Sequence, residues 1–422
     1  MAPTARGDRI VIDPTGPLHG EVRISGAKNS ALKLMAATVV APGRHVLRNV
    51  PRISDVDWMA EVLRSLGVEV AWEGDELVLD TSGDVLARAP VELVERMRAS
   101  TALLGPLLSR CGEAHMALPG GDDFGGRPID LHLQSLEALG ATFDLDDGVV
   151  VGHAPRLRGT RIDLEYPSVG ATENLMLAAV RAEGRTVIDN AAREPEIADL
   201  ASFLNRMGAK VLGAGSPTIT VEGVDELRPV EHPVVADRIE AATYLCALGA
   251  AGGEIRLIGA RDDHMTTLIR QLGLIGVRVA PDRDGLWAMR REPLRAASVA
   301  TLPYPGLPTD VLPMMVALLS VAEGTSYATE NLFSGRFRYV AELREMKARI
   351  EVEGHHMVIE GVERLTGADV TAADIRAGAA LVVAALAAEG PTTIGQAGHL
   401  DRGYDDLDGK LSALGVKVGR KG

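Results

Sequence analysis

The chain has 422 residues and a formal net charge of −14, with 46% hydrophobic and 24% charged residues. This composition is that of an ordinary globular protein, and the length favours two domains over one. The negative charge argues against a surface that binds nucleic acid or anionic membranes, so local positive charge must hold any polyanionic ligand.

Cysteine content and hydropathy indicate in which cellular compartment the protein is found. Cys111 and Cys246 are too few for a disulfide framework and lie in or beside apolar segments, so we expect small core residues in a reducing compartment. Residues 1–9 are polar and lack the apolar segment of a signal peptide. The longest apolar run, 377–388, is shorter than the roughly 20 residues that span a bilayer. We therefore expect a cytoplasmic protein.

A short signature recurs along the chain: a Leu, Ile or Met, then Gly, then alternating apolar residues. The glycine stands at positions 67, 140, 208, 276 and 415, and a degenerate copy falls at 347, so successive copies are 68 to 73 residues apart. Six repeats of about 70 residues therefore fill the chain.

Each signature closes an amphipathic helix, because glycine can end a helix in the left-handed conformation and a strand pattern follows it. In chain order, these helices are predicted at 55–66, 130–139, 196–207, 263–275, 339–346 and 405–414. Each repeat begins with a nearly wholly apolar helix, which should be buried. These helices are predicted at 30–40, 100–108, 171–180, 241–248, 311–321 and 377–388. A short strand opened by glycine comes next, as at 184–190 and 324–329.

This order of elements predicts an α/β (α+β) fold with three repeats per domain, sheets outside, buried helices in the middle and threefold pseudosymmetry. One closed parallel barrel is disfavoured, because six apolar helices would then face water.

Charged or polar residues stand at or just before the N-termini of all six buried helices. They are Lys28 and Asn29, Arg98, residues 168–172, Asp237 and Arg238, Asp310, and Arg376. Helix N-termini attract anions, so the set predicts a substrate with several phosphates or carboxylates. Each residue taken singly is also explained as a helix cap. Asp55, Glu194 and Glu196 are interpreted as caps and loop anchors.

The segment 119–132 combines four glycines with Asp122, Asp123 and Arg127. It is interpreted as a mobile lid that carries an acid and an anion clamp, and taken alone it also fits a solvated turn. His132 is interpreted as a residue behind this lid. The ten histidines are scattered without ligand spacing, so neither a metal nor a cofactor is expected.

Ten collinear motifs span almost the whole chain. They are Ile24–Leu32, Arg98–Ser100, 119–132, Pro167–Asn174, Asn190–Ile197, Asp237–Glu240, Pro308–Asp310, Gly335–Phe337, Asp374–Ala377 and Asp401–Tyr404. Together they resemble the enolpyruvyl transferases. The resemblance implies a two-domain inside-out α/β barrel, with one domain at 28–235 and the other at 1–27 plus 236–422.

The resemblance also implies a reaction. The enolpyruvyl group of phosphoenolpyruvate would pass to the 3′-hydroxyl of UDP-N-acetylglucosamine, with loss of phosphate, in peptidoglycan synthesis. These small molecules would be the partners, without nucleic acid or membrane.

Residue roles follow from the same resemblance. Phosphoenolpyruvate would be held by Lys28, Asn29, Arg127 and Arg402. Asp122 would donate a proton to C3, and Asp310 would orient and deprotonate the sugar hydroxyl. The UDP-sugar would contact Arg98, Arg127, Pro128, Ile129, Asp130, Leu131, Ser168, Val169, Gly170, Asp310 and Leu332, with residues 127–131 at the uridine and residues 168–170 at the diphosphate.

Asp122 departs from the family pattern, because most members have cysteine there, the residue that fosfomycin alkylates. A carboxylic acid can donate the proton if its pKa is raised well above about 3.9, but it lacks the thiolate that attacks the epoxide. The sequence therefore predicts fosfomycin resistance. Asp123 is the alternative donor.

The sequence bears on three other functions. A paralogue acting on another uridine nucleotide remains open. A synthase of the shikimate type is disfavoured, because the uridine-type run 127–131 is intact. An inactive nucleotide-sugar-binding protein should have lost Lys28, Asp310 or Arg402, and all three are present.

Overall fold

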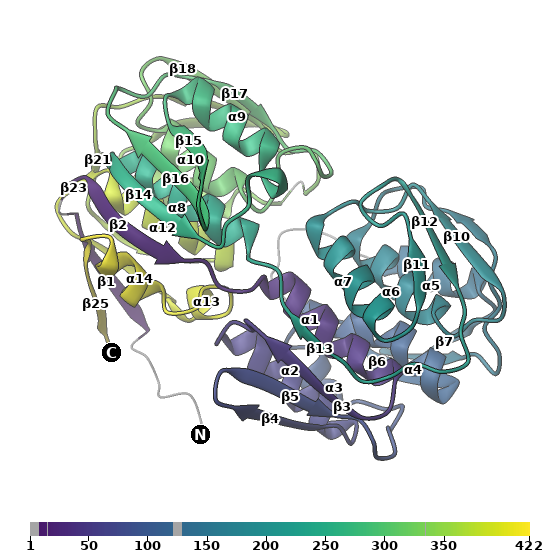
Figure 1. Ribbon diagram of the computed structural model, residues 1–422. Coiled ribbons are helices and arrows are strands. Elements are labelled where there is room, and N and C mark those ends of the chain that lie inside the picture. The colour runs from purple at the N-terminus through teal and green to yellow at the C-terminus, as the bar shows by residue number, and fades with distance from the viewer. Residues whose placement is uncertain (1–7, 15, 121–128, 334) are drawn as a thin grey trace. The chain divides into compact units, whose positions relative to one another are not determined.

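The computed structural model describes residues 8–14, 16–120, 129–333 and 335–422 (Figure 1). These residues divide into two compact units. The first unit comprises residues 26–120 and 129–235, and the second comprises residues 8–25 and 236–422. The first crossover between the units therefore falls two residues before the boundary predicted from the sequence. Each unit is described by itself below.

The first unit contains three repeats, each with an apolar helix followed by an amphipathic one. The apolar helices are α1 (Lys28–Ala37) with η1 (Thr38–Val40), α4 (Leu104–Cys111) preceded by η2 (Arg98–Leu103), and α6 (Val169–Ala179). The amphipathic helices are α2 (Ser54–Ser65), α5 (Asp130–Ala138) and α7 (Pro195–Arg206), and a short helix α3 (Val91–Val94) lies between the first two repeats.

Each repeat of this unit builds one small sheet, whose strand after the apolar helix pairs with the hairpin that closes the repeat. The first sheet has the order β13 (Glu231–Pro233), β3 (Arg44–Arg48), β5 (Glu76–Asp80), β4 (Glu69–Glu73). The second is β6 (Glu113–Ala117), β8 (Val149–His153), β7 (Thr142–Asp146). The third is β11 (Lys210–Leu212), β12 (Thr218–Glu222), β10 (Arg185–Asp189), β9 (Arg161–Asp163).

The second unit repeats the pattern. Its apolar helices are α8 (Arg238–Ala251), α10 (Leu312–Leu319) and α12 (Ile375–Leu386). Its amphipathic helices are α9 (Thr266–Ile275), α11 (Arg338–Glu345) and α14 (Leu407–Ala413), with the short elements η3 (Asp262–His264) and α13 (Gly398–Asp401) before the first and last.

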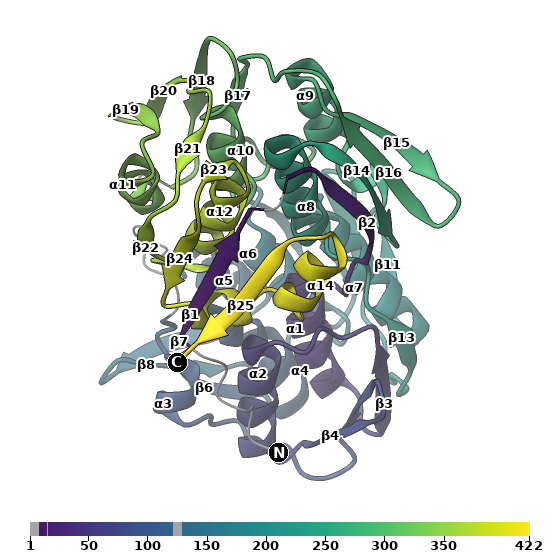
Figure 2. The same cartoon turned by 90° about the vertical axis from the view of Figure 1, so that its left-hand side faces the viewer.

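The sheets of the second unit take in the N-terminal strands. One sheet has the order β15 (Arg278–Asp282), β16 (Gly285–Arg290), β14 (Gly253–Ile258), β2 (Leu18–Arg23). The next is β17 (Ser298–Ala300), β18 (Thr325–Thr329), β20 (His356–Glu360), β19 (Arg349–Glu353). The last is β22 (Asp369–Thr371), β24 (Thr392–Gly395), β1 (Arg9–Asp13), β25 (Lys417–Lys421), and β21 (Leu365–Thr366) pairs separately with β23 (Ala388–Glu389). Figure 2 shows β1 beside β25, so strands near the two ends of the chain pair in one sheet.

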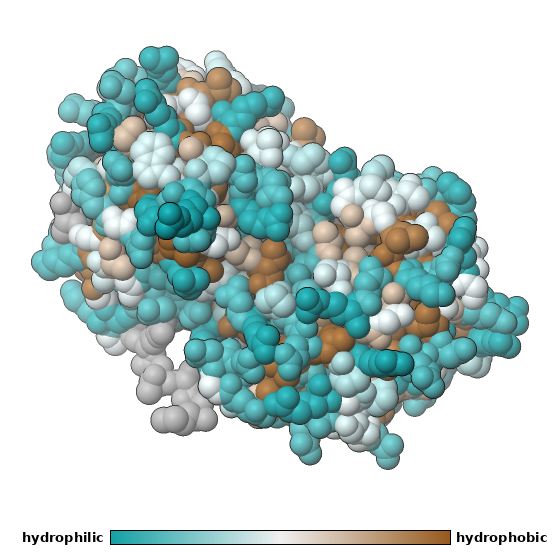
Figure 3. Space-filling model, viewed as in Figure 1, coloured by the Kyte–Doolittle hydropathy of each residue, from teal (hydrophilic) through white to brown (hydrophobic). Residues whose placement is uncertain are grey.

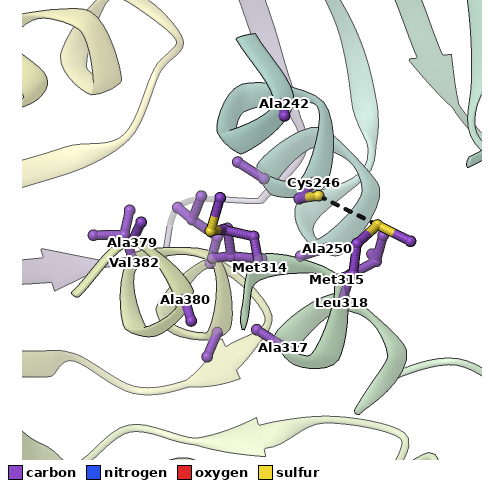
Figure 4. Close-up of a cluster of buried hydrophobic side chains, with 14 of the residues drawn as sticks. Ala242, Cys246, Ala250, Met314, Met315, Ala317, Leu318, Ala379, Ala380 and Val382 are labelled. Atoms are coloured by element: carbon purple, nitrogen blue, oxygen red, sulfur yellow. Dashed lines mark hydrogen bonds between the residues drawn. The ribbon is translucent and has the colours of Figure 1, made fainter. Parts of the chain in front are cut away.

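Apolar helices form the core of each unit, as predicted. In the second unit α8, α10 and α12 pack against one another, and their side chains are buried almost throughout. Figure 4 shows this packing, with the Cys246 thiol 3.7 Å from the Met315 thioether. Small side chains let the helices approach closely, which agrees with the Ala-rich sequence. Cys111, in contrast, is only partly buried.

Left-handed residues close the amphipathic helices. Gly67, Gly140, Gly208, Gly276 and Gly415 have φ values of 89°, 99°, 104°, 117° and 88°. In the degenerate copy, Lys347 takes the same conformation with φ 71°. The repeat is therefore conserved in backbone geometry even where the glycine is missing, at the cost of some strain.

Helix ends differ from the predicted ones for local reasons. Residues 262–264 form a 3₁₀ turn, so α9 begins at Thr266 instead of residue 263. Asp406 has φ 48°, so α14 begins at Leu407 instead of residue 405. α12 ends at Leu386 because Ala388 and Glu389 pair with β21.

The surface is mixed in character. Hydrophilic residues cover much of the face in Figure 3, and hydrophobic residues show between them. Within the described residues, no helix is long and apolar enough to cross a membrane.

Candidate active site

Lys28 is fixed by an ion pair in the first unit. It is the first residue of α1 and 8% exposed, and its Nζ lies 2.5 Å from Oδ2 of Asp55, in the first turn of α2. Asp55 does not cap α2, because the N-cap residue is Ile53 and makes no side-chain cap bond. Of the two roles expected for Asp55, helix cap and loop anchor, the N-cap position therefore belongs to Ile53 instead. A buried carboxylate beside it stabilises the Lys28 ammonium and limits its rotamers.

The start of α1 is also tied to α7. The Ser30 hydroxyl donates to Asp199 at 2.5 Å, and Asp199 lies 2.7 Å from Nε2 of His232. Asn29 is exposed at the second position of the helix. The predicted phosphoenolpyruvate residues of this helix thus stand at a helix start that contacts both α2 and α7.

A second positive group lies at the start of the next repeat. Arg98 opens η2, and burial lowers the pKa of its guanidinium from the ordinary value.

Lys33 of α1 lies 2.5 Å from Glu173 of α6. Burial raises the pKa of Glu173, and Lys33 opposes that rise.

The predicted diphosphate residues form the N-terminus of α6. Ser168 is the N-cap residue, and its hydroxyl accepts a hydrogen bond from the Ala171 N–H at 3.3 Å. The N–H groups of Val169 and Gly170 precede the first intrahelical bond, so the helix itself gives them no acceptor. Together with the helix dipole they make an anion-binding end.

The predicted uridine residues are described only in part. Ile129 is buried as the N-cap residue of α5, Asp130 is exposed at its first position, and Leu131 is half-buried. The lid residues Asp122, Arg127 and Pro128 lie outside the described residues.

Asp310 in the second unit is held by two arginines. It lies before α10, and its carboxylate accepts from Arg336 at 2.6 Å and from Arg376 at 3.2 Å. The arginine side chains are 4% and 7% exposed, and that of Asp310 is 26% exposed. Burial alone would raise the pKa of Asp310, but the two guanidinium groups outweigh it and hold the pKa well below the usual range. Asp310 is therefore an ionised hydrogen-bond acceptor and a weak base.

Glu330 connects Asp310 to Leu332. The buried Glu330 carboxylate accepts from the Thr309 hydroxyl at 2.7 Å and from the Leu332 N–H at 2.8 Å. Thr309 in turn accepts from Arg336 at 2.9 Å. The sequence alone predicts no role for Arg336 or Glu330. The Gly335–Phe337 motif was a signal for Arg336, but a single glutamate after a strand gave none for Glu330.

Arg402 belongs to a neighbouring segment of the second unit. It ends α13 and is half-buried. Two residues later, the buried Tyr404 hydroxyl lies 3.4 Å from Nη1 of Arg376. This segment therefore contacts the group formed by Asp310, Arg336 and Arg376, called the Asp310 cluster below. Asp401 pairs with Arg420 at 2.8 Å, which fixes α13 against β25.

Among residues 8–14, 16–120, 129–333 and 335–422, no group of three or more His, Cys, Asp or Glu side chains is arranged to hold a metal ion. In each unit the charged groups that do gather are cations with carboxylate partners. Such sites bind and orient anions and accept hydrogen bonds from hydroxyl groups.

Comparison with known proteins gives consistent matches over nearly the full length. The family model EPSP synthase (3-phosphoshikimate 1-carboxyvinyltransferase) matches residues 12–411. The UDP-N-acetylglucosamine 1-carboxyvinyltransferase of Corynebacterium jeikeium (strain K411) is 49% identical over 413 residues, which are 98% of this chain and 99% of that protein.

Two solved structures share the fold. The enolpyruvyl transferase NikO from Streptomyces tendae superposes with a TM-score of 0.87 at 28% identity, over 98% of each chain. The EPSP synthase from Acinetobacter baumannii superposes with a TM-score of 0.77 at 18% identity, over 98% of this chain and 100% of that one. The predicted fold, a two-domain inside-out α/β barrel, is thereby confirmed.

Proposed function

The chain belongs to the enolpyruvyl transferase family, and we propose that it transfers the enolpyruvyl group of phosphoenolpyruvate to the 3′-hydroxyl of UDP-N-acetylglucosamine. The observation that carries this proposal is the 49% identity, over nearly the full length of both proteins, to a relative named UDP-N-acetylglucosamine 1-carboxyvinyltransferase. The alternative of another uridine nucleotide as acceptor has no support of that strength.

The reaction is an addition followed by an elimination. The sugar O3′ forms a bond to C2 of phosphoenolpyruvate while C3 takes up a proton. The C2–O bond to phosphate then breaks, C3 loses a proton, and inorganic phosphate leaves with the enol ether as the other product. The chemistry requires an acid near C3, an acceptor for the hydroxyl proton, and cations on phosphate and carboxylate.

Residues of the chain are proposed for each requirement. Lys28, Asn29, Arg127 and Arg402 bind phosphoenolpyruvate. Lys28 is suited to this because Asp55 keeps its ammonium in place. Asp122 is the proposed donor to C3, and its pKa must be raised for that task.

Asp310 is the proposed acceptor for the 3′-hydroxyl. Its ion pairs with Arg336 and Arg376 favour orientation of the hydroxyl over permanent removal of its proton, because the carboxylate has low proton affinity. The proton then leaves the hydroxyl as the new C–O bond forms. Leu332 is proposed at the sugar, since its backbone is tied to the same cluster through Glu330.

The UDP-sugar is proposed to lie along the first unit. Arg98 and residues 127–131 would contact the nucleotide, and Ser168, Val169 and Gly170 would bind the diphosphate. The N–H groups at the start of α6, to which the helix itself gives no acceptor, support the last assignment.

The proposal places the enzyme in the cytoplasm, where phosphorylated metabolites are retained, and at the first committed step of peptidoglycan synthesis. Cell-wall formation, cell shape and division would depend on it. Asp122 in place of cysteine supports fosfomycin resistance as part of the same proposal.

Phosphate release from phosphoenolpyruvate tests the function. The enzyme would be assayed with UDP-N-acetylglucosamine, UMP and shikimate 3-phosphate as separate acceptors, and products would be identified by mass spectrometry. We expect release, and an enol ether product, with UDP-N-acetylglucosamine alone. Release only with UMP would support the paralogue, and release with none of the three would refute the proposal.

A further inference from the structure

His132 lies where the first turn of α5 meets the first turn of α6, and it is 6% exposed. A Cβ added to Gly170 would lie 2.6 Å from Cε1 and 2.8 Å from Nε2 of the imidazole. The edge of the ring between these two atoms therefore rests directly on the N-terminus of α6, and only glycine leaves room for it.

Asn174 determines which ring nitrogen carries the proton. Its Oδ1 accepts from the Gly105 N–H at 2.8 Å, and its Nδ2 donates to the Thr101 carbonyl at 3.0 Å. Because backbone groups have fixed roles, the orientation of the amide is fixed, and Nδ2 has one further N–H to give. His132 Nδ1 lies 2.8 Å from Nδ2, so Nδ1 must accept. The proton of the neutral ring is therefore on Nε2, at the edge that faces Gly170.

This Nε2–H group has no hydrogen-bond acceptor among the described residues, although the side chain is more than nine-tenths buried. An N–H group in a largely buried side chain that has no acceptor among these residues is available to donate to a ligand. Burial, with Lys33 and Arg98 nearby, also lowers the pKa of His132 to about 3, so the ring is neutral at physiological pH. The donor is present in the folded protein over the whole neutral range.

We propose that His132 Nε2–H donates to the diphosphate of the acceptor at the N-terminus of α6, alongside the N–H groups of Val169 and Gly170. The inference rests on the proposed function and adds a binding residue to its acceptor site. Three donors would converge there on one anion. A neutral donor suits this place, because the positive helix end would oppose a second positive charge.

The role predicts selectivity for phosphorylated ligands. A hydrogen bond to a charged group changes affinity by roughly 10- to 100-fold. His132→Phe keeps a ring against Gly170 and removes the donor. We expect its Kd for UDP and for UDP-N-acetylglucosamine to rise by about that factor, with the Kd for uridine unchanged. His45→Phe is the matched control, since His45 is also buried in the first unit but contacts the Ala41 carbonyl; it should bind all three ligands as the wild type does.

A second measurement uses the unaltered protein. In ¹⁵N-histidine NMR spectra, the His132 signal should show a protonated Nε2 that shifts on addition of UDP and not of uridine. A protonated Nδ1, or equal loss of UDP and uridine affinity in His132→Phe, would overturn the inference. Wild-type protein that binds UDP but releases no phosphate with UDP-N-acetylglucosamine would refute the proposed function and leave the assignment of His132 standing.

Discussion

Replacing Asp310 by asparagine removes one negative charge and keeps the shape of the side chain. Arg336 and Arg376 then lose their shared carboxylate while their own side chains stay 4% and 7% exposed. Breaking a buried ion pair costs about 3–5 kcal/mol. The amide oxygen still accepts one hydrogen bond and the position is partly exposed, so we expect a loss near the lower end, about 3 kcal/mol.

Tryptophan fluorescence can localise this loss. The chain has three tryptophans, with Trp287 in β16 of the second unit and Trp58 and Trp72 in the first. In a protein that keeps Trp287 as its only tryptophan, the Asp310→Asn substitution should move the midpoint of urea unfolding to a lower urea concentration. Unfolding followed through Trp58 and Trp72 should stay unchanged. The two units are followed separately because a two-unit protein need not unfold in one transition.

Turnover should fall as well. Loss of the hydroxyl acceptor is expected to lower kcat by roughly 10²- to 10⁴-fold. The control is Asp282→Asn, because Asp282 pairs with Arg256 at 2.6 Å on the exposed surface of the same unit. That variant should keep wild-type stability and turnover. An Asp310→Asn enzyme with unchanged Trp287 unfolding and turnover within tenfold of the wild type would refute the reasoning.

Three further predictions concern Asp55, the buried histidines of the first unit, and Asp122. Asp55→Asn should lower kcat/KM for phosphoenolpyruvate at least about tenfold in steady-state assays, because Lys28 loses the carboxylate that orients it, and an unchanged value would contradict that role. Burial lowers the pKa values of His45 and His132 from 6.5 to about 4 and about 3. As the pH falls below 6.5, both histidines therefore take up protons in the unfolded chain before they do so in the folded protein. The free energy of unfolding of the first unit should then fall with pH, by up to roughly 2.7 kcal/mol per pH unit. Urea titrations at several pH values should show about half that slope in His45→Phe, and a pH-independent wild type would rule the account out. The wild-type enzyme should resist fosfomycin and Asp122→Cys should show time-dependent inactivation, whereas rapid titration of the wild type by the drug would count against Asp122 as the reason.

Periodic features of the sequence predicted the fold well. The apolar helices and the signature that ends each amphipathic helix are local patterns, so they can be read without knowledge of tertiary contacts. Lys347 shows the limit of the pattern. It has no glycine to mark the turn, yet its φ of 71° matches the glycines of the other repeats. Spacing, rather than residue type, revealed that copy.

Partners across the chain were harder to predict. Asp55 follows Lys28 by 27 positions, and nothing in its local sequence distinguishes an ion-pair partner from a helix cap. Glu330 acts on Thr309 and on the backbone of Leu332, a role that depends on a strand and a loop meeting in space. The low proton affinity of Asp310 likewise comes from Arg336 and Arg376, 26 and 66 positions away.

Under the proposed function, the Asp310 cluster also bears on how a chain of net charge −14 would bind anionic substrates. Asp310 shares its carboxylate between two buried arginines, so positive charge stands directly beside it where water cannot fully screen it. The carboxylate nevertheless keeps its negative charge in the neutral pH range, because the same arginines lower its pKa. A single cluster can thus attract a phosphorylated substrate and still present an acceptor to a hydroxyl group. An isolated arginine would supply only the attraction, and an isolated aspartate would repel the substrate that it has to orient.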